Sequence, residues 1–224
     1  MRKTIAVKTQ QHIINDITPF ELTTKVSEVQ NAFNQLSYSH IPVTKDGIFE
    51  GAISENDAHC YDAEKTLEAY QYSLESFHVK QHTNWLDILE AFALNNSTIM
   101  PVLSENYKYI GYYELSDIMN IFNDTPFLGE AGGIIVVEKE IAGYSFSEIC
   151  QIVESNDAKI LGVFVSKMEN NTAQITIKIG HTGINAIVQT FRRYSYNVVS
   201  NHEEDRFIED LKKRSKYLDK YLKM

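Results

Sequence analysis

Residues 39–57 read SHIPVTKDGIFEGAISEND, and residues 98–117 read TIMPVLSENYKYIGYYELSD. Both stretches contain a Pro-Val pair in an apolar run, then a polar turn, then a glycine and finally an aspartate. The Pro-Val pair recurs 59 positions later, whereas the glycine and the aspartate recur 60 positions later, which indicates one residue inserted in the second turn. The chain therefore contains an internal tandem repeat, and two copies are too few for a solenoid.

The segment before each stretch predicts an amphipathic helix. Apolar side chains fall at helical spacing in both copies, at Val26, Val29, Ala32 and Phe33 in the first and at Trp85, Ile88, Ala91 and Phe92 in the second. We expect helices over roughly residues 26–37 and 85–95. In each copy a short strand that opens with proline, a turn, a second strand from the glycine and a final helix from the aspartate follow. This order predicts two similar α/β units packed against each other.

Composition bounds the class of protein. The 224 residues are enough for two domains, and 43% hydrophobic and 23% charged residues are ordinary for a globular protein. A net charge of -9 disfavours a nucleic acid as the main partner. No apolar run approaches the ~18 residues of a membrane span, and no signal-peptide pattern is present. We expect a cytoplasmic protein without a membrane partner, in which the isolated Cys60 and Cys150 are buried thiols.

At these motifs the sequence resembles the CBS family. Residues 39–43 with 51–57 look like one CBS motif, and residues 99–102 with 111–117 are similar but weaker. The resemblance implies a tandem CBS module over residues 1–126, with copies at about 10–65 and 70–122, folded as an intramolecular pseudo-dimer. It also implies that the cleft between the copies binds an adenine nucleotide, such as AMP, ADP or ATP, or a related adenosyl ligand.

The Gly-x-x-Ser-x-x-Asp segment of the first copy has a physical logic for this role. A strand ends and a helix begins there, and a helix N-terminus presents unpaired N–H groups that suit phosphate. Ser54 would donate to a phosphate oxygen, and by the resemblance Asp57 would accept hydrogen bonds from the ribose hydroxyls. The alternative is that Ser54 and Asp57 only cap the helix, because Ser-x-x-Asp resembles a capping box.

Other residues of the first copy complete the expected nucleotide site. The resemblance places His40 near phosphate, followed by Ile41 and Pro42, although an isolated histidine is more often structural or solvent-facing. In the lead-in segment, the Thr18 backbone and the Phe20 ring would hold the adenine, or would form a turn with a core aromatic.

The second copy departs from the pattern. Glu114 stands where the first copy has Ser54, and a carboxylate there would repel phosphate. Asp117 is retained and is included among the nucleotide-binding candidates, but Ser116 before it makes helix capping a sufficient explanation. We therefore expect one intact site and one degenerate site.

The rest of the chain predicts a second domain. Residues 127–133 look like a linker, and residues 134–200 give the order βαββαβ of a ferredoxin-like fold. This order resembles an ACT domain, in which the loop at Ile141, Ala142 and Gly143 would contact an amino acid at a dimer interface, although Ala142 replaces the family's proline. Residues 201–224 predict a C-terminal helix, acidic at its start and basic later.

The sequence contains no zinc motif, nucleophile elbow or dinucleotide-binding glycine pattern. We expect a non-enzymatic regulator with no catalytic residue and no metal site, active as a homodimer and read by a regulated protein that the sequence does not name. The domain order is similar to bacterial regulators of the acetoin-utilisation-protein-B type. The alternative is a structural or protein-interaction module whose clefts hold no nucleotide.

Overall fold

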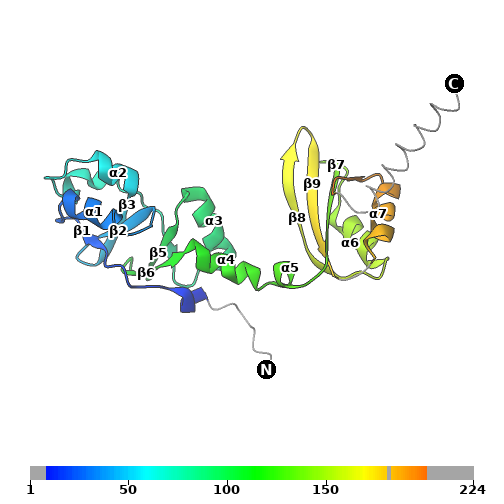
Figure 1. The fold of residues 1–224 in the computed structure, drawn as a ribbon, viewed down its shortest axis with the longest axis horizontal. Helices are drawn as coiled ribbons and strands as arrows, with labels where there is room; N and C mark the ends of the chain where they lie inside the picture. Colours follow the sequence, from blue (N-terminus) through cyan, green and yellow to red (C-terminus); the bar gives the residue numbers. More distant parts are fainter. Residues whose placement is uncertain (1–8, 181–182, 201–224) are drawn as a thin grey trace, which may run out of the picture. The chain divides into compact units, whose positions relative to one another are not determined.

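The computed structural model describes residues 9–180 and 183–200. The chain divides into two compact units, Met1–Phe122 and Asn123–Met224. The C-terminal helix expected over residues 201–224 lies outside the described residues. Both units are mixed α/β (Figure 1).

The first unit contains two three-stranded sheets, one from each copy of the repeat. In the first copy the order is β1-β2-β3, and the elements are β1 (Phe20–Glu21), α1 (Val26–Phe33), β2 (His40–Lys45), β3 (Ile48–Ser54) and α2 (Glu55–Cys60). In the second copy the order is β4-β5-β6, and the elements are β4 (Val79–Lys80), α3 (Trp85–Asn95), β5 (Ile99–Leu103), β6 (Tyr109–Glu114) and α4 (Leu115–Asn123). Two short 3-10 helices, η1 (Thr9–His12) and η2 (Leu67–Ser73), belong to the segments that lead into the copies.

Helix boundaries follow the local capping chemistry. Helix α3 spans the predicted residues and ends where Asn96 adopts a left-handed conformation, φ 47°. Helix α1 ends at Phe33, earlier than expected, because the chain turns at Asn34 so that Leu36 packs on the core. The final helix of each copy begins two residues before its aspartate.

The prediction that each strand opens with proline is wrong, because Pro42 and Pro101 are the third residues of β2 and β5. Strand β2 is central, yet Pro42 fits for two reasons. Ala52 lies opposite Pro42 in β3, and its backbone N–H and C=O are both hydrogen-bonded to Glu75. Pro42 and Ala52 therefore form a pair without backbone hydrogen bonds between them, and β3 needs no N–H from Pro42. On the other side, β1 pairs only from Val43 onward. The missing N–H of proline therefore leaves no gap in the ladder.

The two copies exchange their lead-in segments. Ile14, which precedes the first copy, exchanges both backbone hydrogen bonds with Tyr112 of the second copy at 2.9 Å. Glu75, which precedes the second copy, does the same with Ala52 of the first, at 2.7 and 2.9 Å. These crossings make the two copies one structural unit with approximate two-fold symmetry.

The repeated glycine permits each crossing. Gly51 and Gly111 have φ values of +156° and +151°. A Cβ on Gly51 would lie 2.7 Å from Leu74 Cβ, and a Cβ on Gly111 would meet the carbonyl oxygen of Ile14. The glycine of the motif is therefore required by the close approach of the other copy's lead-in.

Ser39 and Thr98 occupy equivalent places in the two copies and bond to each other. The Ser39 amide donates to Thr98 Oγ1 at 3.0 Å, and the Thr98 amide donates to Ser39 Oγ at 2.9 Å. This reciprocal pair places the approximate two-fold axis between the starts of β2 and β5.

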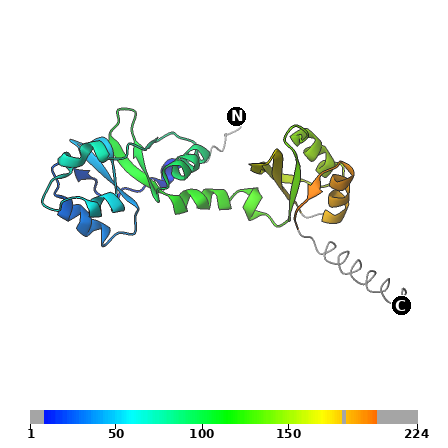
Figure 2. The same cartoon turned by 90° about the horizontal axis from the view of Figure 1, so that it is seen from above.

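The second unit has the predicted βαββαβ order. Its elements are α5 (Pro126–Gly129), β7 (Gly133–Glu140), α6 (Phe146–Glu154), β8 (Ile160–Glu169), β9 (Thr172–Ile179), α7 (Ile184–Arg193) and β10 (Asn197–Val198). The sheet order is β10-β7-β9-β8, with every neighbouring pair antiparallel. Helices α6 and α7 lie on the same face of this sheet (Figure 2). The expected linker is partly helical, because Pro126 occupies the first turn of α5.

Asn170 and Asn171 form the hairpin turn that joins β8 and β9. Both residues have positive φ, 50° and 61°, as a two-residue turn between β8 and β9 requires. Asp46-Gly47, with φ 53° and 76°, forms the equivalent turn in the first unit.

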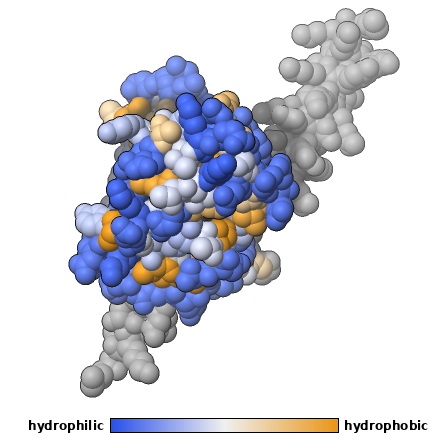
Figure 3. Space-filling view, turned by 90° about the vertical axis from the view of Figure 1, so that its left-hand side faces the viewer, coloured by the Kyte–Doolittle hydropathy of each residue, from blue (hydrophilic) through white to orange (hydrophobic). Residues whose placement is uncertain are grey.

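The face of the molecule in Figure 3 is largely polar. On the face in Figure 3, hydrophobic colour occurs as separate spots among hydrophilic side chains.

Cys60 is exposed and Cys150 is half-buried, so the expectation that both are buried is wrong. Cys60 is the last residue of the short helix α2 and lies at the surface. No helix in residues 9–180 and 183–200 has the length and apolar character to cross a membrane. The same residues contain no group of three or more histidine, cysteine, aspartate or glutamate side chains placed to hold a metal ion.

Candidate functional site

A cleft of about 310 Å³ lies at the predicted motif of the first copy. We call it the first cleft. Its walls come from both copies: from the first, Ser39, His40, Ser54, Glu55 and Asn56; from the second, Glu75, Asn95 and Asn96. The volume is at the lower end of small-molecule sites. The exchange of lead-in segments therefore creates a polar cleft that neither copy would form alone.

Ser54 is the N-cap of α2. Its Oγ accepts a hydrogen bond from the backbone amide of Asp57 at 3.1 Å. The capping alternative is thus present in the structure, and the Ser54 hydroxyl hydrogen stays available to donate to a ligand. Asp57 is half-buried in the first turn of the helix, and it is outside the set of residues that line the cleft.

His40 is buried, with 6% of its surface exposed, and its ring is held on both sides. Nε2 lies 3.1 Å from Glu75 Oε1, and Nδ1 lies 2.8 Å from Ser39 Oγ. A neutral ring with its hydrogen on Nε2 satisfies both contacts, since it donates to Glu75 and accepts from Ser39. The ring edge also packs against Phe77, with the centroids 5.1 Å apart. His40 thus serves first to join the two copies.

The remaining candidates of the first copy are not brought into the first cleft. Ile41 and Pro42 are buried in β2, and Ile41 belongs to the hydrophobic core. Thr18 is exposed, and Phe20 is half-buried and packs on the core of the first copy. For Phe20, the geometry favours the alternative of a core aromatic.

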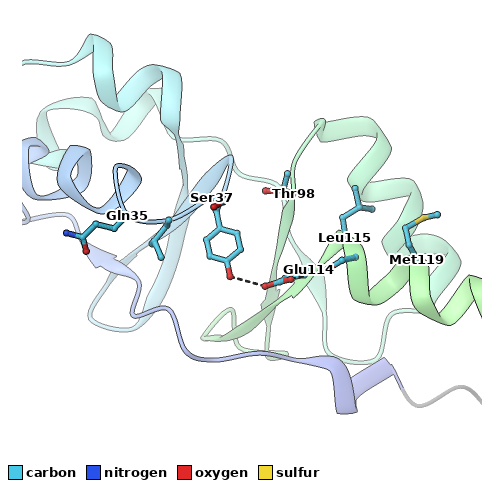
Figure 4. A pocket seen from close by; sticks show the side chains of 9 residues that line it. Gln35, Ser37, Thr98, Glu114, Leu115 and Met119 are labelled. Carbon is cyan, nitrogen blue, oxygen red and sulfur yellow. Dashed lines mark hydrogen bonds between the residues drawn. The ribbon is translucent and has the colours of Figure 1, made fainter.

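A second cleft, of about 740 Å³, lies at the motif of the second copy. It is lined by Gln35, Leu36, Ser37, Tyr38, Thr98, Glu114, Leu115, Ser116 and Met119 (Figure 4). Its lining corresponds to that of the first cleft, because residues 35–38 follow the end of α1, and Asn95 and Asn96 lie at the end of α3. The two clefts are therefore related by the repeat, but their chemistry differs.

The carboxylate of Glu114 is already hydrogen-bonded within the protein. Tyr38 Oη donates to Glu114 Oε1 at 2.8 Å, drawn as the dashed line in Figure 4, and Ser116 Oγ donates to Oε2 at 3.0 Å. The place that a serine hydroxyl takes in the first copy is thus occupied by a carboxylate that binds its own neighbours.

Tyr112 extends this network to the lead-in of the first copy. Its hydroxyl donates to Asp16 Oδ1 at 2.6 Å and lies 3.2 Å from Tyr38 Oη. Each phenol has one hydroxyl hydrogen, and Tyr38 and Tyr112 each donate theirs to a carboxylate. The longer contact between the two phenol oxygens is therefore not a hydrogen bond. Burial raises the pKa of Tyr112 well above its ordinary value, and the hydrogen bond with Asp16 raises it further. Tyr112 therefore stays neutral and acts as a donor.

Asp117 is half-buried in the first turn of α4 and lies outside the lining of the second cleft. The neighbouring Ser116 hydroxyl bonds to Glu114.

Several residues of the two clefts were not predicted from the sequence. Glu75 reaches the first cleft and Asp16 reaches the second network only because the lead-ins cross between copies. Asn95 and Asn96 carry a readable signal, since an Asn pair at the end of an apolar helix pattern predicts a left-handed C-cap. By contrast, no pattern in the sequence links Tyr38 to Glu114.

In the second unit, the loop at residues 141–143 is exposed beside a pocket of about 520 Å³. Of its three candidates, only Gly143 lines this pocket, with Glu138, Lys139, Glu140, Thr172, Ser195 and Asn197. The Ile141 amide donates to the carbonyl of Asn171 at 3.0 Å, which ties the loop to the β8–β9 turn.

Lys139 is held at this pocket. Its Nζ lies 2.9 Å from Glu148 Oε2, donates to the Tyr194 carbonyl at 3.2 Å and lies 4.1 Å from the Tyr196 ring centroid. The hydrogen bond with Lys139 lowers the pKa of Glu148 below its ordinary value, and that with Tyr196 lowers it further. Burial raises the pKa of Tyr196 to about 12, with a further contribution from Glu148.

No protein-family model matches the sequence, and no curated protein matches it. Solved structures match part of the chain. A CBS domain pair/ACT domain protein from Thermotoga maritima is 21% identical with a TM-score of 0.47, and the match covers 52% of this chain and 96% of that one. The CBS domains of a transcriptional regulator from Streptococcus pneumoniae are 16% identical (TM-score 0.46; 51% and 98% covered). CBSX2 in complex with AMP is 14% identical (TM-score 0.42; 51% and 95% covered). Each match covers about half of this chain.

Proposed function

We propose that this chain is a regulatory protein that binds an adenine nucleotide or a related adenosyl compound in the first cleft. It has no catalytic activity of its own in this proposal. The main support for the proposal is that the walls of the first cleft come from both repeat copies. A ligand there would touch both copies and change how they pack. A ligand can shift the balance between two conformations only if it binds one of them more tightly. Because the walls of this cleft come from both copies, two arrangements of the copies would bind the ligand with different affinities.

The first cleft is favoured over the second by the group that precedes its final helix, a hydroxyl rather than a carboxylate. Ser54 retains a hydroxyl hydrogen, and the side-chain amides of Asn56 and Asn96 line the same space without a hydrogen bond to another described residue. The Asn95 amide also lines it but donates to the Ala91 carbonyl. In the second cleft, Glu114 presents a carboxylate that its neighbours already hold. In this proposal Asp57 accepts hydrogen bonds from the ribose, which requires the ligand to extend along α2 beyond the cleft itself.

Thermal unfolding with a panel of adenosine, AMP, ADP, ATP, S-adenosylmethionine and amino acids tests the proposal. A ligand at 100 times its Kd stabilises the protein by about 2.7 kcal/mol, which is roughly 5–10 °C for a unit of this size. Asp57→Ala is expected to abolish the shift. Asp117→Ala is the matched control, because it removes the equivalent carboxylate from the second copy, and its shift is expected to persist. If no compound shifts the unfolding temperature, the clefts are structural and the protein is an interaction module.

For the second unit we propose an ACT-like role in forming a homodimer through its sheet. The face opposite α6 and α7 carries Ile134 and Phe164, which are 47% and 45% exposed, while their neighbours Ile135 and Val137 fill the core. Exposed aliphatic and aromatic side chains on one sheet face are suited to burial against a second copy. Sedimentation equilibrium tests this: the wild type is expected to be dimeric and Phe164→Glu monomeric, whereas an unchanged mass would overturn this part of the proposal.

A further inference from the structure

We infer that the adenosyl ligand of the first unit is neutral or positively charged, and that the clefts select against adenine di- and triphosphates. The inference rests on the proposed function and adds the charge class of the ligand. It is drawn from the charged groups that line the clefts.

The first cleft is lined by two carboxylates, Glu55 and Glu75, and by no lysine or arginine among the residues that the structure describes. Glu75 has 42% of its side chain exposed, so it presents charge to the cleft. A polyphosphate in this space would bring like charges within a few ångströms, where repulsion is only partly screened by water.

His40 is the single side chain in this lining that can become positive. It is buried, and Glu75 lies at one ring nitrogen and Ser39 at the other. If His40 is protonated, its charge is neutralised by Glu75, and if it is neutral it offers no charge to a phosphate. In both states the net charge of the lining is negative.

The second cleft offers a polyphosphate no better site. Its one ionisable acid is Glu114, and no lysine, arginine or histidine is present in its described lining. Leu36, Leu115 and Met119 add apolar walls instead. Neither cleft thus provides the cationic side chains that proteins use to hold several phosphates.

Isothermal titration calorimetry of the full-length protein with adenosine, AMP, ATP and S-adenosylmethionine tests the inference. We expect affinity to fall with each added phosphate, with ATP at least about tenfold weaker than adenosine, and S-adenosylmethionine no weaker than adenosine. Because the discrimination is electrostatic, 0.5 M salt is expected to strengthen ATP binding, the opposite of its effect on a basic phosphate site.

Glu75→Gln and Glu55→Gln are expected to narrow the ratio between adenosine and ATP affinities. Glu68→Gln is the matched control, because it removes the same charge from an exposed position outside the cleft lining. ATP binding as tight as adenosine, or weakened by salt, would overturn the inference while leaving the proposed function in place. Absence of binding by every compound would instead overturn the proposed function, and the inference with it.

Discussion

Tyr38 of the first copy donates a hydrogen bond to Glu114 of the second copy at 2.8 Å, at the position equivalent to Ser54. The first copy has a potential ligand-binding hydroxyl at this position, whereas the second has a carboxylate that is hydrogen-bonded within the protein. The two clefts share a scaffold but differ in the group that precedes the final helix of each copy.

Glu114→Ser is expected to restore the second cleft. Removing the carboxylate frees the Tyr38 hydroxyl and introduces the hydroxyl that Ser54 provides in the first copy. Titration calorimetry with adenosine is expected to change from one site per chain to two. Glu90→Ser, an exposed acid on α3, is the control and should keep one site. An unchanged stoichiometry for Glu114→Ser would show that more than this side chain closes the second cleft.

Tyr112→Phe is expected to destabilise the first unit by about 1–2 kcal/mol, since it removes a charge-assisted hydrogen bond from a fully buried ring to Asp16. Urea unfolding measures the change. Tyr107→Phe removes a hydroxyl from a ring that is 54% exposed and should stay within about 0.5 kcal/mol of the wild type. Equal effects of the two substitutions would argue against the network.

Gly111→Ala is expected to cost about 2 kcal/mol or more, because the new Cβ would meet the backbone carbonyl of Ile14 where φ is +151°. Gly51→Ala should behave similarly. Gly143→Ala, where a Cβ would make only ordinary contacts at 3.6 Å or more, is the control and should change the free energy of unfolding by no more than about 0.5 kcal/mol. A small effect at Gly111 would contradict the close crossing of the lead-in segment.

The Lys139–Glu148 pair predicts a pH dependence in the second unit. The folded-state pKa of Glu148 is depressed, mainly by Lys139, so its contribution is present above the ordinary glutamate pKa. As pH falls through the folded value, the carboxylate is protonated in both states and the contribution is lost. Glu148→Gln should therefore be less stable than the wild type at pH 7, and the difference in unfolding free energy should shrink as the pH falls below the ordinary glutamate pKa. A difference that stays constant as the pH is lowered through this range would contradict this account.

The sequence predicts local structure here better than it predicts the sites. Residues 85–95 and the turn at Asn170-Asn171 follow from periodicity and turn chemistry, which act over a few residues. The positions of Glu75 and Asp16 follow from the exchange of lead-in segments, which brings together residues far apart in the sequence. The interior place of Pro42 depends likewise on where a neighbouring strand begins. The motif at residues 51–57 lies at the first cleft, but the residues that the other copy adds to this cleft could not be predicted from the motif.

The most direct test of the central claim is a crystal structure of the chain with the adenosyl compound that stabilises it most. The account predicts ligand density in the first cleft, with the ribose hydroxyls within hydrogen-bond distance of Asp57 and the Ser54 hydroxyl bonded to the ligand. Density in the second cleft beside Glu114, or only in the second unit, would contradict it.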